Sequence, residues 1–250
     1  MRKLNFKCNI LMIIMCKMDG PKVSVVIPTF QEGRYIGELL SKLSKINPHL
    51  ELVIVDGGST DETISVAKKF TNKVYVLNKR GIGRARNYGA YKSSGEIIVF
   101  MDADVDPPRN FLKKVLSVFN EKSVVGATCN IMPKNPNPFE YAFFRFYNLL
   151  LRLFTYFKPH SRGEFLAVRR EAFVRVGGFN ESLPCLEDHE LVFRLSKIGK
   201  FIFLNDLIVY ESMRRFRRMG FLKVLKLWIS NYISLFLFHK TISKSWEPVR

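Results

Sequence analysis

The stretch Glu96-Ile97-Ile98-Val99-Phe100-Met101-Asp102-Ala103-Asp104 decides the fold of this chain. Its apolar, β-branched part predicts a buried strand, and two carboxylates follow where that strand opens into a loop. Residues two apart on an extended segment point to the same side, so Asp102 and Asp104 form a closely spaced pair. Such a pair suits a hard divalent cation and leaves coordination positions for phosphate oxygens. Taken alone, it would more simply be a turn with two solvated acids.

Strands and helices on either side of this stretch predict an α/β domain with a parallel sheet. Strands are expected over residues 23–30, 52–55, 74–77 and 97–101, a helix over residues 33–45, and a second helix capped by Ser59 or Thr60. In parallel sheets, ligands bind at the carboxyl ends of the strands. Residues 28–32, Asp56 and the Asp102/Asp104 pair all lie at such ends. Three polar clusters are therefore expected to meet in one crevice.

Five short motifs follow one another between Val23 and Met219. They are Pro28-Thr29-Phe30-Gln31-Glu32, Asp56-Gly57-Gly58-Ser59-Thr60-Asp61-Glu62-Thr63, Gly81-Ile82-Gly83-Arg84-Ala85-Arg86-Asn87-Tyr88-Gly89, Asp102-Ala103-Asp104 and Glu187-Asp188. In order and separation they resemble the motifs of the family 2 inverting glycosyltransferases, although the second has one extra small residue. The resemblance implies a single Rossmann-like α/β domain of GT-A fold with a mostly parallel central sheet.

The resemblance also implies roles for the acidic residues in moving a sugar from a nucleoside-diphosphate sugar to an acceptor. Asp188 would be the base that deprotonates the acceptor hydroxyl. Asp104 would be the main ligand of Mg²⁺ or Mn²⁺, and Asp102 would contact the metal or the ribose. Glu32 and Asp56 would contact the nucleoside. The alternative for Asp188 is that it caps a helix over residues 190–196.

The remaining positions that the resemblance assigns to the donor are Pro28, Thr29, Arg84, Arg86 and Asn87. Arg84 and Arg86, expected in a loop bounded by glycines, suit the diphosphate because guanidinium groups make multidentate contacts to phosphate oxygens. The alternative is that both arginines belong to a solvated basic surface.

The last core strand departs from the pattern of many relatives, which place a histidine after it. Here Ile208-Val209-Tyr210 leads to Arg214 and Arg215. Either arginine would instead contact the diphosphate, or residues 214–218 are simply the basic start of a helix. The four histidines are scattered along the chain, so a zinc site is not expected.

The composition indicates one domain with appendages. The chain has 250 residues, 47% of them hydrophobic, and lacks a polar linker long enough to separate two domains. The division expected is an amino-terminal extension over residues 1–20, the transferase domain over 21–219, and a carboxy-terminal amphipathic helix with its tail over 220–250. Cys8, Cys16, Cys129 and Cys185 have no metal-binding spacing and are expected to be free thiols in a reducing compartment.

The net charge of +18 calls for an anionic partner. Nucleic acid is not the partner expected, because the cations accompany apolar segments, residues 141–157 and 221–238, in which polar side chains recur at helical spacing. In the first segment the polar stripe consists of Arg145, Asn148, Arg152 and Thr155. Basic, aromatic, amphipathic helices of this kind lie in the membrane interface and are attracted to anionic lipid. The alternative is that both helices pack on the catalytic core.

The amino-terminal residues superficially resemble a signal peptide, but their apolar core is short and no small-residue cleavage site follows. They are expected to be an interfacial anchor, or else the true start is Met18. The sequence thus predicts a metal-dependent, inverting glycosyltransferase, cytoplasmic and peripheral at the inner membrane face. Its acceptor would be a hydroxyl or a lipid phosphate. The alternatives are a nucleotidyltransferase and a non-catalytic basic module that binds membranes or nucleic acid.

Overall fold

The computed structural model describes residues 22–47, 49–155, 157–238 and 240–243 of the chain. Within them, the elements in chain order are β1 (Val23–Thr29), α2 (Gly33–Ile46), β2 (Glu51–Asp56), α3 (Thr63–Ala67), β3 (Val74–Val76), α4 (Ile82–Lys92), β4 (Ile97–Met101), α5 (Phe111–Phe119), β5 (Val124–Pro133), α6 (Pro138–Thr155), β6 (Phe165–Arg169), α7 (Arg170–Arg175), α8 (Glu187–Leu195), β7 (Lys200–Glu211), α9 (Arg214–Met219) and α10 (Phe221–Phe238). The predicted amino-terminal extension lies outside the described residues.

The described strands form one sheet of seven, in the order β3-β2-β1-β4-β6-β5-β7. All neighbouring pairs are parallel except those of β6, which runs antiparallel to both β4 and β5. The predicted α/β fold with a mostly parallel central sheet is therefore confirmed. In the register of β1 and β2, Thr29 pairs with Asp56, so the carboxyl ends of these strands lie together.

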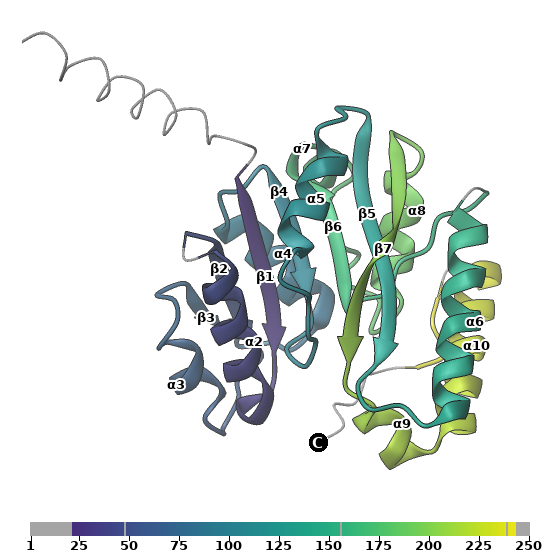
Figure 1. Cartoon of the computed structure of the whole chain (residues 1–250), viewed down its shortest axis with the longest axis horizontal. Coiled ribbons are helices and arrows are strands. Elements are labelled where there is room, and N and C mark those ends of the chain that lie inside the picture. The colour runs from purple at the N-terminus through teal and green to yellow at the C-terminus, as the bar shows by residue number, and fades with distance from the viewer. Residues whose placement is uncertain (1–21, 48, 156, 239, 244–250) are drawn as a thin grey trace, which may run out of the picture.

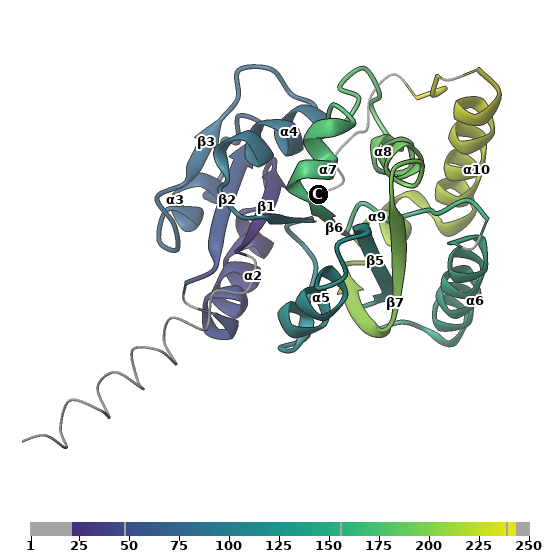
Figure 2. The ribbon, with the colours of Figure 1, turned by 90° about the horizontal axis from the view of Figure 1, so that it is seen from above.

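Helices cover both faces of the sheet, which explains why β4 is apolar along its whole length. Figure 2 shows α2 and α5 on one face and α4, α7 and α8 on the other. Val99 and Met101 of β4 pack in the core on the side of α2 and α5, and Ile98 and Phe100 pack in the core on the opposite side. Burial on both faces is typical of parallel strands and fixes the position of the loop that follows β4.

The segment predicted as a glycine-bounded loop is mostly helix, since α4 begins at Ile82. Gly89 lets this helix lie close to β1 and β2: a Cβ atom there would stand 2.3 Å from Cγ1 of Val26 and 3.1 Å from Cγ2 of Val55. The prediction that Ser59 or Thr60 caps the next helix was also wrong. Helix α3 begins at Thr63, whose backbone N–H donates to the side chain of Asp61 at 3.1 Å.

Helices α6 and α10 lie side by side beyond the β7 edge of the sheet (Figures 1 and 2). Phe144 of α6, Phe216 of α9 and Val224 of α10 are buried in a small core of their own. Helix α10 has the predicted bounds. The polar stripe predicted on α6 is divided, because Arg145 and Arg152 are exposed while Asn148 is buried.

No helix among the described residues has the length and hydropathy needed to cross a membrane. Cys129 and Cys185 are buried free thiols, as predicted, whereas Cys8 and Cys16 lie outside the described residues. The proposed division into an extension, a domain and a carboxy-terminal helix stays a prediction.

Candidate functional site

A crevice of about 580 Å³ lies at the carboxyl ends of β1, β2 and β4. Of the residues predicted to bind the donor or the metal, those that line it are Pro28, Thr29, Glu32, Asp102, Asp104, Arg214 and Arg215. The polar ends of β1 and β4 therefore meet, as the strand-end rule predicts.

Asp56 lies beside this crevice but not on its lining. Its side chain has no exposed surface and accepts hydrogen bonds from the hydroxyl of Thr29 at 2.8 Å and from the backbone N–H groups of Gly58 and Ser59 at 2.9 and 2.6 Å. The carboxylate thus holds the loop after β2 in place. The predicted contact of Asp56 with the nucleoside stays a prediction.

Arg84 and Asn87 do not line the crevice, although Glu181, with which both side chains interact, does. The guanidinium of Arg84 pairs with Glu181 at 3.0 Å, and both groups are partly exposed. The amide of Asn87 donates to the backbone oxygen of Phe179 at 2.9 Å and accepts from its N–H at 2.8 Å. Asn87 therefore joins α4 to the segment after α7, and the predicted contacts of Arg84 and Asn87 with a donor stay predictions.

Arg86 is the arginine of α4 that reaches the site, and its side chain is only 1% exposed. It pairs with Asp102 at 2.9 Å and with Glu187 at 2.5 Å, and it donates to the backbone oxygen of Gly163 at 2.8 Å. The acid pair after β4 is thereby connected to the acidic pair that begins α8.

Arg214, the first residue of α9, closes the other side of the acid pair. It donates to both carboxylate oxygens of Glu32 at 2.6 and 2.7 Å and lies 3.1 Å from Asp104. Arg214 starts a helix, as one alternative for this segment predicted, and its side chain also lines the crevice, so its contact with a diphosphate stays a prediction.

Burial acts on the acid pair more strongly than the arginines do. It raises the pKa of Asp102 to about 7, although Arg86 opposes the rise, and it raises the pKa of Asp104 despite Arg214. The oxygen atoms of these two carboxylates are ligands that suit a hard divalent cation. The described part of the chain gathers no group of three or more potential metal ligands, so an ion here would need further oxygens from phosphate or water.

Other cations of the crevice were missed by the sequence reasoning. Lys79 and Arg80 line it, and the guanidinium of Arg80 lies 3.8 Å from the ring centre of Phe30. Lys79 and Arg80 precede the third motif and belong to no motif themselves. Their position next to Gly81 is the one sequence signal that could have placed them in the site.

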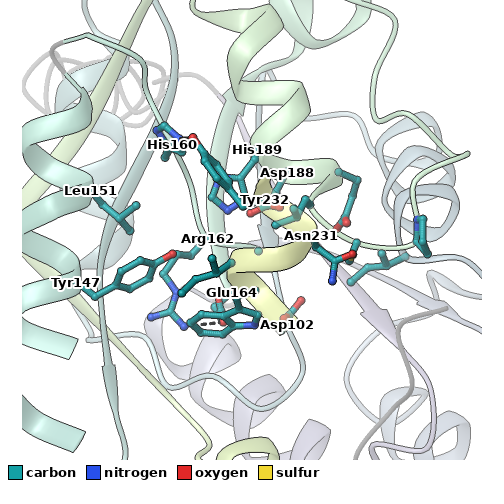
Figure 3. Close-up of a pocket in the computed structure, with 18 of the residues that line it drawn as sticks. Asp102, Tyr147, Leu151, His160, Arg162, Glu164, Asp188, His189, Asn231 and Tyr232 are labelled. Atoms are coloured by element: carbon teal, nitrogen blue, oxygen red, sulfur yellow. Dashed lines mark hydrogen bonds and ion pairs between the residues drawn. The ribbon is translucent and has the colours of Figure 1, made fainter. Parts of the chain in front are cut away.

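Asp188 lies in a second cavity, of about 360 Å³, where α8 begins. It is 5% exposed, and its burial raises the pKa of its carboxyl to about 6. Figure 3 shows Asp188 beside His189, with His160 and Tyr232 grouped next to them. Ile82, Asp102 and Pro184 line both this cavity and the crevice at the strand ends, so the two share a wall.

A buried charged cluster was also missed. Arg162 pairs with Glu164 at 2.9 Å and with Glu211 of β7, and Arg162 and Glu164 line the second cavity (Figure 3). Arg162 and Glu164 precede β6, which is antiparallel, so the start of this strand reaches the edge of the sheet where parallel strands end.

Several known proteins are similar to this chain. Poly(ribitol-phosphate) beta-N-acetylglucosaminyltransferase TarS of Staphylococcus aureus is 33% identical over 109 residues, which are 40% of this chain and 19% of that protein. The O-antigen chain rhamnosyltransferase WbaN of Salmonella anatum is 28% identical over 198 residues, 72% of this chain and 62% of that protein. The chain therefore spans less than two thirds of the length of either relative.

Solved structures show the same fold. The mannosyltransferase PcManGT of Pyrobaculum calidifontis, in complex with GDP-Man and Mn²⁺, matches 90% of this chain and 72% of its own with a TM-score of 0.67 and 23% identity. TarS 1-349 in complex with UDP-GlcNAc matches 76% of this chain and 58% of its own with a TM-score of 0.62 and 22% identity. The model of the family "Glycosyl transferase family 2" matches residues 24–178, more than half of the chain. The protein has the GT-A fold and belongs to glycosyl transferase family 2.

Proposed function

We propose that the protein is a metal-dependent, inverting glycosyltransferase that moves a sugar from a nucleoside-diphosphate sugar to an acceptor at the cytosolic membrane face. The observation that carries this proposal is the shared wall at Asp102. A crevice with two candidate metal ligands meets a cavity that contains a buried carboxylate, Asp188. A donor on one side and an acceptor on the other would face each other across Asp102.

The reaction would be a single in-line displacement. The acceptor oxygen forms a bond to the anomeric carbon of the sugar, and the proton of its hydroxyl passes to Asp188. The bond from that carbon to the diphosphate oxygen breaks, and its electron pair leaves with the nucleoside diphosphate. Asp188 is preferred over Glu187 as the base, because Glu187 is already paired with Arg86.

The negative charge of the departing diphosphate calls for cations in the crevice. Asp102 and Asp104 would hold Mg²⁺ or Mn²⁺, which neutralises this charge when it is bound. Arg214 and Arg215 line the crevice from one side and Lys79 and Arg80 from another, where they suit phosphate oxygens. The relative crystallised with GDP-Man and Mn²⁺ supports the choice of metal and donor class.

The location at a membrane is supported by the outer surface of α6 and α10. Eight of the exposed apolar side chains of these two helices are Phe146, Leu149, Leu153, Phe154, Ile229, Ile233, Leu237 and Phe238, and we name this set the apolar face. Large exposed apolar patches mark sites of interaction with membranes or proteins. Arg145 and Arg152 lie on the same helix as part of this face, and the net charge of +18 favours anionic lipid.

Calorimetry with UDP and with GDP, each with and without manganese, tests the proposal. We expect manganese-dependent binding of one of the nucleotides in the wild type and its loss in Asp104→Asn. Asp106→Asn is the matched control: Asp106 lies two residues further on and pairs with Lys42 outside the crevice, so this variant should bind like the wild type. Equal affinity with and without manganese in the wild type would contradict the metal-dependent function.

A further inference from the structure

Part of the wall of the cavity beside Asp188 is formed by α6 and α10, which lie outside the central sheet. The apolar side chains of these walls are Leu150, Leu151, Phe154, Leu225, Trp228 and Ile229. A polar acceptor would leave this surface in contact with water or with polar groups. An apolar chain would remove it from water, which is favourable in proportion to the area covered.

The apolar walls continue onto the outside of the molecule. Phe154 and Ile229 line the cavity and are nevertheless 50% and 51% exposed. Both belong to the apolar face, and Figure 2 shows that the helices carrying them lie side by side. An apolar chain that occupies the cavity can therefore extend onto the surface proposed to contact the membrane.

The floor of the cavity has no excess of positive charge. Arg86 is paired with Asp102 and Glu187, and Arg162 is paired with Glu164 and Glu211. Burial lowers the pKa of both His160 and His189 to about 4, so neither histidine is a cation at neutral pH. Because Asp188 adds a further carboxylate, an anionic headgroup would be repelled here.

The same floor offers polar atoms to an uncharged ligand. Among the described residues, Nη1 of Arg162 and Nδ1 of His189 are buried without a hydrogen-bond partner, and both residues line the cavity. Arg162 as a whole is only 4% exposed. A buried polar atom without a partner is unfavourable unless a ligand or water satisfies it. A hydroxyl group can both donate and accept, so it can satisfy such atoms.

We infer that this cavity binds an amphiphilic acceptor, with its apolar chain between α6 and α10 and an uncharged, hydroxyl-bearing headgroup at Asp188. The inference rests on the proposed function and narrows it, because it excludes a lipid phosphate as the group that receives the sugar. The hydroxyl oxygen gains the bond to the anomeric carbon, its proton goes to Asp188, and the nucleoside diphosphate leaves with the electron pair of the broken bond.

Fluorescence of Trp228 tests this assignment. The chain has two tryptophans, Trp228 and Trp246, so Trp246→Phe leaves Trp228 as the sole emitter in the full-length protein. Dodecyl maltoside with a brominated chain, added below its micelle concentration, should quench this emission saturably. Octyl glucoside should displace the brominated detergent and restore the emission, whereas maltose, which has no alkyl chain, should not. Octyl phosphate should compete at least about tenfold less well than octyl glucoside, the ratio that 1.4 kcal/mol of binding free energy produces.

A matched pair of variants separates the cavity from the outer surface. Leu225→Gln changes a residue of the cavity wall, and Leu222→Gln makes the same change on the same helix at an exposed residue outside the cavity. The first should weaken quenching by about tenfold and the second should leave it unchanged. Equal effects of both variants, or no saturable quenching at all, would overturn the inference, and equal competition by octyl phosphate would overturn the uncharged headgroup.

Nucleotide binding in the presence of manganese, measured on the same samples, distinguishes a failure of this inference from a failure of the proposed function. If quenching fails while nucleotide binding persists, the acceptor assignment alone is wrong. If the alkyl glycoside binds but neither UDP nor GDP does, the proposed transferase function is wrong and the cavity remains a site for amphiphiles.

Discussion

Arg86 is the residue on which the geometry of the candidate site depends most. It lies buried between Asp102, which belongs to the shared wall, and Glu187, which precedes the candidate base. Removal of one partner of a buried ion pair leaves the other charge uncompensated in a medium of low polarity. Arg86 therefore determines whether the loop after β4 and the start of α8 keep their relative positions.

The variant Arg86→Ala should lower the free energy of unfolding by about 3–5 kcal/mol. Arg84→Ala, two residues away on the same helix, is its control, and should cost at most about 1 kcal/mol because the Arg84–Glu181 pair is partly exposed. Urea denaturation of both variants checks this. Similar losses of stability in the two would mean that Arg86 is not the structural centre of the site.

Asp188→Asn should reduce sugar transfer by about 10²–10⁴-fold, the usual contribution of a general base, and leave nucleotide affinity unchanged. Glu190→Gln is the control, since Glu190 pairs with Arg194 on the same helix and should leave transfer unaffected. Single-turnover transfer and calorimetry would measure the two effects. A variant Asp188→Asn that keeps transfer within about tenfold of the wild type would reassign the base.

The pH dependence of transfer follows from the same residue. A base must be ionised to accept a proton, and burial raises the pKa of Asp188 to about 6. The rate of transfer should therefore be full well above pH 6 and fall as the pH drops below 6. A rate that stays constant from pH 7 to pH 5, in a range where the protein remains folded, would contradict this role.

The sequence was informative for those site residues whose position depends on strand ends alone. Glu32, Asp102 and Asp104 follow parallel strands and do line the crevice. Arg84 could not be separated from Arg86 in the same way, because the direction of each side chain depends on the rotation of α4 against the sheet. That rotation is set by the close approach at Gly89, a tertiary contact. Similarly, nothing local reveals that the strand after Arg162 runs antiparallel.

At the scale of elements, Asn148 fixes α6 to the sheet. Its side-chain oxygen accepts from the backbone N–H of Ile131 at 3.1 Å, and its NH₂ group donates to the oxygen of the same residue at 2.8 Å. Ile131 comes directly after the irregularity in the register of β5 and β7 between Cys129 and Asn130. From the sequence, Asn148 belonged to a polar stripe with Arg145 and Arg152, since helical spacing cannot distinguish a solvated amide from one that bonds a strand.

Asn148→Ala should therefore destabilise the protein by about 1–3 kcal/mol, because it leaves buried backbone groups of Ile131 without partners. Arg152→Ala, one turn further along the same helix and exposed, should have little effect. Denaturation measures the stability, and hydrogen exchange at the amide of Ile131 should become faster in Asn148→Ala alone. Unchanged exchange at Ile131 would show that α6 is held by its apolar contacts instead.

At the scale of the whole molecule, the apolar face and the net charge should together give salt-sensitive binding to anionic vesicles. The double variant Ile233→Glu/Leu237→Glu places two carboxylates on the apolar face and should sediment less with such vesicles. The control variant Tyr91→Glu/Val174→Glu adds the same charge at exposed apolar residues elsewhere. Its binding to vesicles should weaken only by the electrostatic contribution of the added charge. Added salt screens that part beyond about 10 Å at 0.1 M but does not weaken apolar insertion. If the wild type does not sediment even at low salt, the membrane proposal is wrong.

The wall that the donor crevice and the second cavity have in common also has a thermodynamic consequence. Since Ile82, Asp102 and Pro184 line both, a ligand bound in one cavity would change the surface that a ligand in the other contacts. Coupling between binding equilibria is reciprocal, so a nucleotide that tightens acceptor binding by about fivefold must itself be bound about fivefold more tightly when the acceptor is present. Each ligand would then act as an effector of the other across the side chains of the shared wall. The affinity measured for either ligand alone would in that case be lower than its affinity in the ternary complex.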